Sequence, residues 1–595
     1  MSFRPAVISV LALAAAMGAT VALAEPRAQV AGELEEDLRE RIVEAIGEVE
    51  DPPSNRFQAR RRARAAAEDA MAVLRSEGYY GATIEDDIEG EAPPVPVIRI
   101  TPGPRFLVSD PDLVWTDPPP EPEVAVEALQ ALEIEEGDPG RAADVIAAEG
   151  RVIARLSELG YPDAVAGDRR VIVDHAASTL QPTYRILAGE PVRLNGVLLN
   201  TQGRTNPRWV ERLAPWTPGD RYRPDSVAEL ERRLLETGVY DSVSIALAPA
   251  EQETAEGLRP VVVALSDQPS RVLEAGVGYS TSEGVGVDAV WTWRNRFGRA
   301  DTLRYEGRLA EIDSRLAVSL SLPHWRRAGR TLTLEAYAVD EDTRAYDRRA
   351  LGASFALQQR IAPTSYFSYG AAIEGGQYDE LDPRFLVDPP VPLERNLAIL
   401  TLQGGANLDY SNDPLDPTQG WRVTVDVQPT AVTGDDSLAF LRAVGQVTTY
   451  VPLDDEGKSV IAGRVRLGSI LGGDDRVPSD RRFYSGGGGS VRGFEYQGVG
   501  PRFPNGTPVG GSSLFETSLE YRRRLGGNFG MALFVDAGSI GGEPAPDFSD
   551  IRYAIGGGVR YHLPFGPIRA DIALPLNPRD GDADFQIYVS IGQAF

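Results

Sequence analysis

The residues whose chemistry stands out surround one arginine in a glycine-rich stretch, residues 481–502. Four consecutive glycines lead into Ser-Val-Arg-Gly-Phe at residues 490–494, and aromatic side chains lie on both sides. Glycine allows the backbone to reverse and to approach other groups closely. A guanidinium held in such a stretch could bind carboxylates through charge-assisted hydrogen bonds. The alternative is a disordered surface loop with a solvated Arg492, and the elements around the stretch decide between the two.

Catalytic chemistry finds little support in the same sequence. The three histidines, His175, His324 and His562, lie in unrelated segments. The residues around Ser490 lack the second glycine of a nucleophile elbow, and the glycine-rich stretch lacks the Lys-Ser/Thr of a phosphate-binding loop. The chain has no cysteine, which excludes disulfides, thiolate catalysis and cysteine zinc sites. We therefore expect no enzyme activity, no metal and no cofactor.

The N-terminus predicts export. The chain has 595 residues, enough for several domains. Arg4, an apolar run over residues 6–23 and a small-x-small site before Glu25 predict a cleavable signal peptide, residues 1–24, in preference to a membrane anchor. No other stretch approaches the roughly 20 apolar residues of a membrane helix. The net charge of −27 argues against nucleic acid as a partner.

The first half of the chain contains a recurrent phrase in helical surroundings. The sequences LRSEGYY, LSELGY and LLETGVY place helix ends at Gly78, Gly160 and Gly238. Each glycine is expected to adopt the left-handed cap conformation, and the aromatic residue after it to begin the next strand. In the third copy Ser226 and Glu229 have capping-box spacing. The inferred unit is a strand, two helices and two strands, repeated three times.

From residue 271 onward the hydrophobic period is two. Residues 302–309 and 421–428 alternate polar with apolar side chains. An even number of strands of about ten residues, each with one polar and one apolar face, is typical of an outer-membrane barrel. A soluble β-sandwich would alternate too, but residues 585–595 form an alternating run with a terminal aromatic residue, which resembles the sorting signal of bacterial outer-membrane barrels. Sixteen such segments begin near residues 272, 284, 301, 313, 331, 350, 364, 398, 421, 440, 459, 512, 529, 553, 567 and 585.

The predicted fold class is therefore a set of α+β N-terminal repeats followed by a 16-stranded antiparallel transmembrane β-barrel. An acidic, proline-rich stretch near residue 110 leaves the first boundary open. The exposed sheet edges of such repeats could accept an extended peptide by strand addition, or the repeats could serve as a rigid stalk. The predicted segments are residues 25–110, 111–190 and 191–270 for the repeats and 271–595 for the barrel.

The sequence VRGF at residues 491–494 resembles the loop motif of the outer-membrane assembly factors that carry polypeptide-transport-associated (POTRA) domains. In that family the loop folds back into the barrel lumen, and its arginine pairs with carboxylates on the two following strands. The resemblance implies Glu520 and Asp536 as those partners, and the period of two places both on the polar face. Residues 409–421 also look like a family motif and are expected to form a fixed periplasmic turn. The implied lumen-loop lock consists of Arg492, Gly493, Phe494, Glu520 and Asp536.

The resemblance covers essentially the whole mature chain and, with three POTRA domains, is closest to the TamA-like subunit of the translocation and assembly module. It implies the outer membrane of a Gram-negative bacterium, with the N-terminal domains in the periplasm. It also implies a non-catalytic role in inserting or secreting client polypeptides such as autotransporters, and a TamB-like inner-membrane partner on the POTRA domains. The alternatives are a two-partner-type secretion pore and a general barrel insertase.

The first and last barrel strands are expected to form a weak lateral seam. The first contains Gly276 and Gly278, and the last contains Gly592 and ends next to Phe595. Opening this seam would expose backbone groups that must find partners in the lipid. A client strand could satisfy them.

Overall fold

The protein is described from a computed structural model. The chain divides into two compact units, of which the first consists of the residues up to Asn195 together with Trp216–Ser226 and Ala248–Pro260. The predicted signal peptide, residues 1–24, lies outside the described residues. The structure describes residues 25–49, 51–91, 93–116, 118–280, 284–310, 312–563, 566–591 and 593–595.

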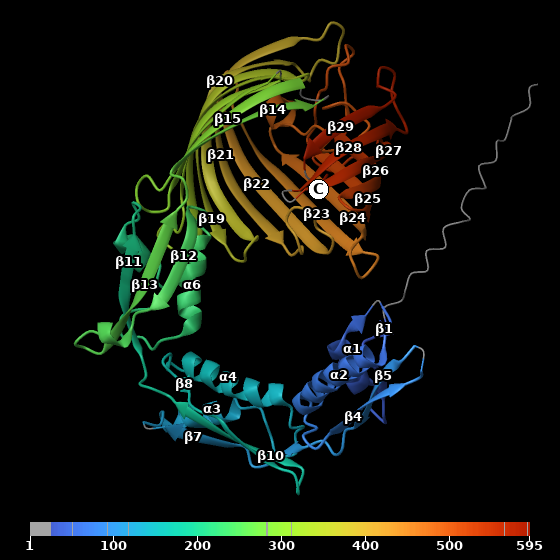
Figure 1. The fold of residues 1–595 in the computed structure, drawn as a ribbon. Helices are drawn as coiled ribbons and strands as arrows, with labels where there is room; N and C mark the ends of the chain where they lie inside the picture. Colours follow the sequence, from blue (N-terminus) through green and yellow to red (C-terminus); the bar gives the residue numbers. More distant parts are fainter. Residues whose placement is uncertain are drawn as a thin grey trace, which may run out of the picture. The chain divides into compact units, whose positions relative to one another are not determined.

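The first repeat packs two helices on a three-stranded sheet (Figure 1). Strand β5 is central, with β2 parallel on one side and β4 antiparallel on the other. Helix α2 buries a stripe of alanines that ends at Leu74, which allows the helix to approach the sheet closely. A short pair, β1 (Glu25–Pro26) and β3 (Glu48–Val49), lies beside them. The elements are β2 (Gln29–Ala31), α1 (Glu36–Ile46), α2 (Arg56–Ser76), β4 (Thr83–Glu89) and β5 (Val95–Thr101).

The second repeat has the same order of main elements. Its last strand, β10, is again central, with β7 parallel on one side and β9 antiparallel. The acidic, proline-rich stretch near residue 110 contains β7 and the start of α3, so it contributes to this repeat. The elements are β6 (Leu107–Val108), β7 (Asp112–Thr116), α3 (Pro122–Gln130), α4 (Ala142–Glu158), β8 (Val165–Ala166), β9 (Arg170–Asp174) and β10 (Thr179–Leu187).

The third repeat follows the same order, with β13 central in its sheet. The second compact unit consists of Gly196–Pro215, Val227–Leu247 and Val261–Phe595. It therefore takes in most of the third repeat together with the barrel. The strand–helix–helix–strand–strand order thus recurs three times, while the number of POTRA domains and their boundaries stay predictions. The elements are β11 (Arg193–Thr201), α5 (Pro207–Glu211), α6 (Pro224–Leu235), β12 (Tyr240–Leu247), η1 (Ala250–Gln252) and β13 (Leu258–Asp267).

The glycines of the recurrent phrase adopt the expected conformation. Gly78, Gly160 and Gly238 have φ values of 94°, 94° and 65° just after α2, α4 and α6. The predicted capping box is wrong. Helix α6 begins at Pro224, whose fixed φ suits the first turn, so Ser226 lies inside the helix.

The aromatic residue of the phrase begins a strand in one copy only. Tyr240 is the first residue of β12, as expected. In the other two copies the next strands begin at Thr83 and Val165, so that prediction is wrong there. Tyr79 and Tyr161 are instead buried in the cores of the first and second repeats, where large aromatic side chains contribute much of the hydrophobic contact.

Within the second unit, the third repeat contacts the turns at one end of the barrel. The backbone N–H of Asn206 donates to the carbonyl of Gly298 at 2.9 Å. Arg360 Nη1 lies 2.7 Å from Glu236 Oε2, just after α6. These contacts explain why most of this repeat belongs to the same compact unit as the barrel. None of the helices in the described part of the chain is both long and apolar enough to cross a membrane.

Sixteen strands form one sheet in sequence order, each antiparallel to the next, which curls into a barrel (Figure 1). This confirms the predicted fold class. The observed strand starts differ from the predicted ones by at most six residues, the largest difference being Pro392 against residue 398. The strands are β14 (Arg271–Ser280), β15 (Gly284–Arg294), β16 (Thr302–Ala310), β17 (Asp313–Leu322), β18 (Arg330–Asp342), β19 (Tyr346–Arg360), β20 (Tyr366–Leu381), β21 (Pro392–Asp409), β22 (Gly420–Gly434), β23 (Leu438–Pro452), β24 (Ser459–Leu471), β25 (Ser513–Gly526), β26 (Phe529–Gly541), β27 (Arg552–Leu563), β28 (Gly566–Pro575) and β29 (Gln586–Ile591).

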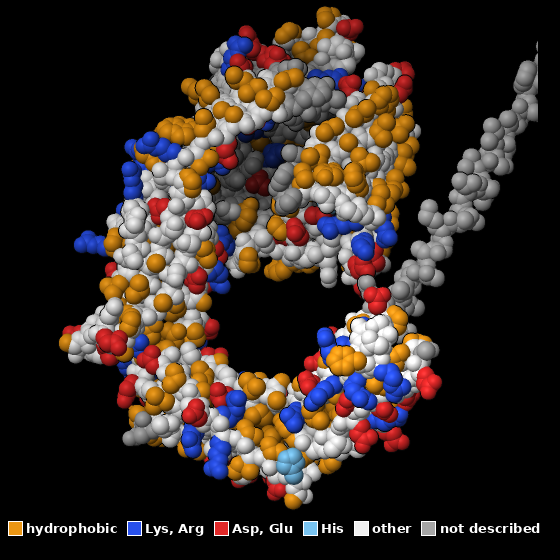
Figure 2. All heavy atoms as spheres, viewed as in Figure 1, with side chains coloured by type: hydrophobic (Ala, Val, Ile, Leu, Met, Phe, Trp, Pro, Cys, Tyr) orange, Lys and Arg blue, Asp and Glu red, His pale blue; other side chains and the backbone are white. Residues whose placement is uncertain are grey.

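The two faces of this sheet differ in polarity. On β25, Glu516, Ser518 and Glu520 are buried on the inner face, while Leu519 is 57 % exposed on the outer face. Hydrophobic side chains gather on the outer surface of the barrel, and charged atoms are visible in its interior (Figure 2). The alternation therefore places apolar side chains toward lipid and ionisable side chains toward the lumen.

Candidate functional site

The glycine-rich stretch belongs to a long connection between β24 and β25, residues 472–512, called here the lumen segment. Two short 3-10 turns begin it, η2 (Asp474–Arg476) and η3 (Ser479–Arg481). Its apolar side chains are buried, including Phe483, Val491 and Phe494. A solvated surface loop would expose these side chains. The segment is therefore folded into the barrel.

Arg492 binds two carboxylates on the wall. Its Nε and Nη2 donate to the two oxygens of Asp536 at 2.8 and 3.0 Å, and its Nη1 donates to Glu520 Oε2 at 2.7 Å. Its backbone N–H also donates to Asp536, at 3.0 Å. The arginine side chain is 2 % exposed and both carboxylates are fully buried. This paired, bidentate geometry is what allows the charges to lie out of water.

The neighbours of Arg492 hold the backbone against the wall. The face of the Phe534 ring lies 3.3 Å from the guanidinium carbon, close enough for a cation–π contact. The backbone N–H of Gly493 donates to the Tyr588 hydroxyl at 3.1 Å, and that hydroxyl donates to the carbonyl of Phe494 at 2.9 Å. Gly493 has φ of 100°, and a Cβ there would lie 2.8 Å from Cβ of Ala554. This position therefore requires glycine.

The cluster is larger than the sequence predicted. Asp571 of β28 lies 3.5 Å from Arg492 Nη1. Arg522 Nε donates to Glu520 at 2.8 Å, Arg560 is paired with Asp571, and Arg569 lies 3.5 Å from Asp571. Four arginines thus share three carboxylates, and the shared partners keep every carboxylate compensated. Asp571, Arg560 and Arg569 were not predicted: a period of two can indicate which face of a strand a side chain lies on, but it holds no signal that these side chains would meet Arg492.

A second ionic cluster, which the sequence analysis missed, holds the start of the lumen segment to other strands. Asp480 Oδ2 lies 3.0 Å from Arg348 Nη1 of β19 and 3.1 Å from Arg481 Nε. Arg481 Nη2 donates to Glu374 of β20 at 2.8 Å. The hydroxyls of Tyr337 and Tyr378 donate to the same glutamate at 2.6 Å each. We call these residues the turn cluster. The name arginine lock is used for the cluster of Arg492, Arg522, Arg560 and Arg569 with Glu520, Asp536 and Asp571.

The turn cluster continues toward β21. Glu380 of β20 accepts from the backbone N–H of Ser479 at 2.8 Å and is paired with Arg395. Arg395 Nη1 in turn donates to the carbonyl of Arg476 at 2.8 Å. The turn cluster lies on β18–β21 and the arginine lock on β25–β28, with β22–β24 between them in the sheet. The lumen segment is therefore anchored to two separate parts of the wall.

The four residues predicted to form the lateral seam do not lie together in the structure. Gly276 and Gly278 lie in β14, opposite Asp288 and Gly286 of β15, whereas Gly592 is outside the described residues. The placement of Phe595 at the seam is wrong. Its ring packs on Tyr450, Val460 and Ala462 of β23 and β24, because this inner wall offers it both an apolar surface and arginine side chains.

The predicted turn at residues 409–421 lies between β21 and β22, as expected. The side chains of Asp409 and Asp413 accept backbone N–H groups inside it. Asp416 additionally accepts from Arg524 Nη2 at 2.5 Å and from Gln593 Nε2 at 2.7 Å. One residue of this turn therefore also binds side chains outside it.

Comparison with known proteins settles the family. Residues 295–595, half of the chain, match the Omp85 superfamily domain. The chain belongs to the Omp85 superfamily. Members of this superfamily are β-barrels of the Gram-negative outer membrane with periplasmic POTRA domains, which confirms the predicted location.

Several curated proteins are similar to this chain in sequence, at low identity. The outer membrane protein assembly factor BamA of Nitratidesulfovibrio vulgaris is 25 % identical over 428 residues, covering 69 % of this chain and 52 % of that protein. BamA of Neisseria meningitidis serogroup B is 21 % identical over 504 residues, covering 75 % and 62 %. The chain thus spans between half and two thirds of the length of these relatives.

The fold also has a counterpart among solved structures. The crystal structure of BamA from Haemophilus ducreyi lacking POTRA domains 1–3 superposes with a TM-score of 0.69 and 19 % sequence identity. The match covers 82 % of this chain and 99 % of that chain. At this identity the likeness shows a shared fold.

Proposed function

We propose that this Omp85 protein inserts or secretes client polypeptides, such as autotransporters, at the outer membrane without catalysis. The observation that carries the proposal is the junction between the first and last strands. Strands β14 and β29 lie next to each other, yet within the described residues no backbone ladder joins them. Every other pair of sequential strands in the sheet is hydrogen-bonded.

This junction could accept a client strand. Among the described residues β14 has ten residues and β29 has six, so part of the edge of β14 has no β29 residue to pair with there. Unpaired backbone groups are costly in lipid, and an extended client segment could pair with them by strand addition. Gly276 and Gly278 in β14 add little side-chain packing to oppose the exchange.

The arginine lock has a supporting role in the proposal. It keeps the lumen segment inside the barrel and against β25, β26 and β28, the strands that precede β29. A wall stiffened in this way leaves the junction as the least constrained part of the sheet. In this account Arg492, Glu520 and Asp536 act as structural residues, and no group performs a reaction.

Disulfide crosslinking across the junction tests the proposal cleanly because the chain has no native cysteine. Leu273→Cys, Ala275→Cys and Val277→Cys, each combined with Ile587→Cys, would be reconstituted with a reporter autotransporter. Assembly of the reporter should stop under oxidation and recover on reduction. The control pair, Val287→Cys with Leu309→Cys, spans a ladder that is already formed and should have no effect. Unchanged assembly with the junction crosslinked would refute the proposal.

The proposal includes a TamA-like assignment with a TamB-like inner-membrane partner on the POTRA domains. The three strand–helix–helix–strand–strand repeats support it. Crosslinking and purification of the full-length protein from cell envelopes tests the partner. Recovery of one large periplasm-spanning protein is expected, whereas recovery of several small lipoproteins would assign the chain to the general insertases.

The buried lumen segment favours a second candidate, a secretion pore that exports a dedicated partner. A segment that fills the lumen would have to leave it before a polypeptide could pass. Single-channel conductance distinguishes the two functions. A sharp rise in conductance for Arg492→Ala favours the pore, and a folded barrel of unchanged conductance favours assembly at the junction.

A further inference from the structure

An open cleft of about 1100 Å³ lies where the third repeat meets the barrel. It is lined by the end of α5 and by the turns that join β15 to β16 and β17 to β18. Figure 2 shows Lys and Arg atoms gathered on the surface in this part of the second unit. Of the described residues that line the cleft, none is acidic and four are arginines, Arg212, Arg299, Arg326 and Arg327. We call it the rim cleft.

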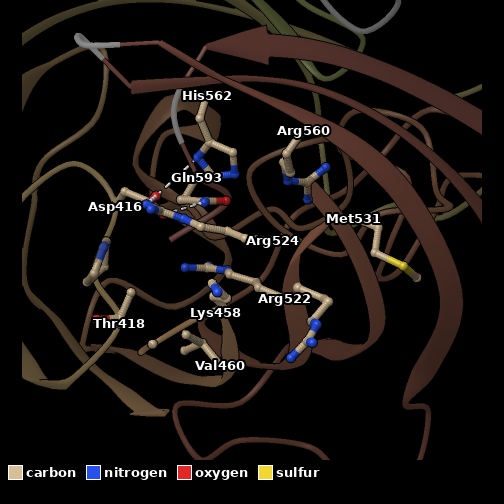
Figure 3. A pocket seen from close by; sticks show the side chains of 13 residues that line it. Asp416, Thr418, Lys458, Val460, Arg522, Arg524, Met531, Arg560, His562 and Gln593 are labelled. Carbon is tan, nitrogen blue, oxygen red and sulfur yellow. Dashed lines mark hydrogen bonds and ion pairs between the residues drawn. The ribbon is translucent and has the colours of Figure 1, made fainter. Parts of the chain in front are cut away.

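The charges of the rim cleft are not neutralised by the protein. None of its four guanidiniums forms an ion pair with a carboxylate in the described part of the chain. The cleft drawn in Figure 3 is the contrast, because each of its five Lys and Arg residues has a carboxylate partner, as Arg524 has Asp416 and Arg523 has Asp454. In a chain of net charge −27, four arginines that converge without a carboxylate form an anion-binding surface.

The turn of residues 323–329, which supplies two of these arginines, is fixed to the third repeat by His324. Nδ1 of His324 accepts from the backbone N–H of Gly329 at 3.0 Å, so Nε2 carries the proton and donates to the carbonyl of Arg233 at 2.8 Å. Burial lowers the pKa of His324, which keeps the ring neutral at pH 7 and preserves both hydrogen bonds. The turn therefore presents its arginines from a fixed support.

The rim cleft continues the lipid-facing side of the barrel. On the outer face of β17, Leu316 is 63 % exposed and Val318 is 36 % exposed. The same alternation leads to Leu322, which lines the cleft together with Trp325. The apolar outer face of the strand thus runs without interruption into a cationic cleft.

Stacked aromatic rings on the neighbouring strands mark the membrane boundary at this level. The ring centroid of Trp291 lies 6.1 Å from that of Trp293 and 5.3 Å from that of Tyr305. The strand register places Trp293 opposite Leu303, and Leu303 opposite Leu320 of β17. Trp and Tyr residues of outer-membrane barrels lie at the level of the lipid headgroups. The end of β17 and the rim cleft beyond it therefore lie at the headgroups of the periplasmic leaflet.

We propose that the rim cleft binds the headgroup of an anionic phospholipid of the periplasmic leaflet. Arg299, Arg326 and Arg327 donate to the phosphate oxygens, and the acyl chains lie along the outer face of β17. Arginine suits this role because its planar fork can donate two parallel hydrogen bonds to one phosphate. The site concerns lipid binding and does not depend on the proposed function in client assembly.

The test compares lipid binding by the full-length protein in neutral detergent micelles, measured by native mass spectrometry. Dioleoyl phosphatidylglycerol should bind the wild-type protein at least about tenfold more tightly than dioleoyl phosphatidylcholine, because several arginines face the anionic headgroup. The triple variant Arg299→Gln, Arg326→Gln, Arg327→Gln should lose this preference. Equal binding of the two lipids by the wild type, or an unchanged preference in the triple variant, would overturn the proposal.

A second triple variant separates the rim cleft from general electrostatic attraction. Arg60→Gln, Arg61→Gln and Arg75→Gln remove the same charge from exposed positions on α2 of the first repeat and should leave the preference unchanged. Loss of the preference in this variant too would show that net charge selects the lipid and would refute the site. Heat-dependent electrophoretic mobility confirms that both triple variants are folded.

Inorganic phosphate distinguishes a lipid headgroup from a soluble anion. Phosphatidylglycerol should stay bound to the wild-type protein in an excess of inorganic phosphate, because its acyl chains add apolar contact that the free ion lacks. Displacement of the lipid by inorganic phosphate would assign the rim cleft to a soluble anion and overturn the lipid site.

A labelled cysteine locates the acyl chains, since the chain has no native cysteine. In nanodiscs, a bimane label on Leu322→Cys should be quenched more by phosphatidylglycerol with brominated acyl chains than by brominated phosphatidylcholine. Val451→Cys is the matched control, because Val451 is 49 % exposed near the end of β23, which also ends on the periplasmic side. Both lipids should quench the control label equally. Equal quenching by the two lipids at Leu322→Cys as well would place the bound lipid away from β17 and contradict the site.

Discussion

The two clusters that anchor the lumen segment are built from the same residue types in opposite arrangements. In the arginine lock the segment supplies the cation, Arg492, and the wall supplies carboxylates whose oxygens are all occupied. In the turn cluster the segment supplies both Asp480 and Arg481, and Asp480 Oδ1 has no hydrogen-bond partner among the described residues. Every carboxylate oxygen of the lock has a donor, although the guanidiniums of Arg522 and Arg560 keep N–H groups without acceptors among the described residues. The turn cluster, by contrast, leaves one buried carboxylate oxygen without a donor.

The difference suggests a division of stability along the segment. A buried cluster whose carboxylates are fully paired loses most when its central cation is removed, because the carboxylates then stay buried without partners. A cluster that already buries an unpaired carboxylate oxygen has lost part of its stabilisation to desolvation. We therefore expect substitutions in the arginine lock to cost more than matched substitutions in the turn cluster, and the following variants test that order.

Arg492→Ala should have the largest effect. It leaves Glu520 and Asp536 buried without their main cation, which typically costs about 3–5 kcal/mol. Urea unfolding in lipid vesicles would measure the loss, and hydrogen exchange should rise over residues 485–499. Arg344→Ala is the control, because Arg344 pairs with Glu495 of the same segment at an exposed position and should cost less than about 1 kcal/mol. Equal losses for the two variants would contradict the lock.

Glu374→Gln should have the next largest effect. It removes the charge that binds Arg348 and Arg481 but keeps the shape of the side chain, and a hydrogen bond to a charged group contributes about 1.5–3 kcal/mol. Backbone hydrogen exchange should increase first over residues 474–484. If exchange instead rises first at residues 485–499, the two clusters are not independent anchors.

Gly493→Ala should cost about 1–2 kcal/mol, because a left-handed backbone disfavours a side chain and the new Cβ would crowd Ala554. The same unfolding measurement applies. Gly489→Ala provides the comparison within the same run of glycines, since nothing lies within 4 Å of a Cβ there. A similar loss at both positions would show that backbone entropy, and not the close approach at Gly493, sets the effect.

Asp480→Asn should have the smallest effect, less than about 1 kcal/mol at pH 7. Burial raises the pKa of Asp480 above its ordinary value of 3.8, although Arg481 and Arg348 oppose the shift. The contribution of this carboxyl is therefore fully present below pH 3.8 and is lost as the pH rises through the folded pKa. Relative to Asp480→Asn, the wild type should gain stability as the pH falls from 7 to 4.

Asp536→Asn sharpens the comparison, because it makes the same chemical change at a carboxylate whose two oxygens are both hydrogen-bonded. It should cost about 3 kcal/mol, since Asp536 accepts three hydrogen bonds from Arg492. Unfolding at pH 7 measures both variants side by side. A larger loss for Asp480→Asn than for Asp536→Asn would reverse the order proposed for the two clusters.

Prediction from the sequence succeeded where the signal was local and periodic. The period of two located sixteen strands and placed Glu520 and Asp536 on the inner face, because alternation along a strand fixes side-chain direction. The glycines at positions 78, 160 and 238 marked helix ends for a similarly local reason. The prediction that the aromatic residue after each glycine begins a strand was wrong in two copies. A hydrophobic residue that follows a helix can pack into the core without belonging to a strand.

The residues that were missed depend on chain segments far apart in sequence. Asp480 meets Arg348 across 132 residues, and no periodicity links a turn after β24 to the wall at β19. Phe595 has the alternation of a strand residue, yet its ring leaves the sheet for Arg464 and Arg522. Such contacts depend on how the sheet curls and where the lumen segment enters it.

By itself the sequence determined the strands, their inner and outer faces, the absence of cysteine chemistry and the arginine motif whose family resemblance implied a lock. Tertiary structure alone decided which inward charges share a network, that the lumen segment has a second anchor, and where Phe595 is bound. The physical reason is that alternation specifies a direction for each side chain, whereas ion pairing requires a distance. Only the curled sheet brings side chains from separate strands within that distance.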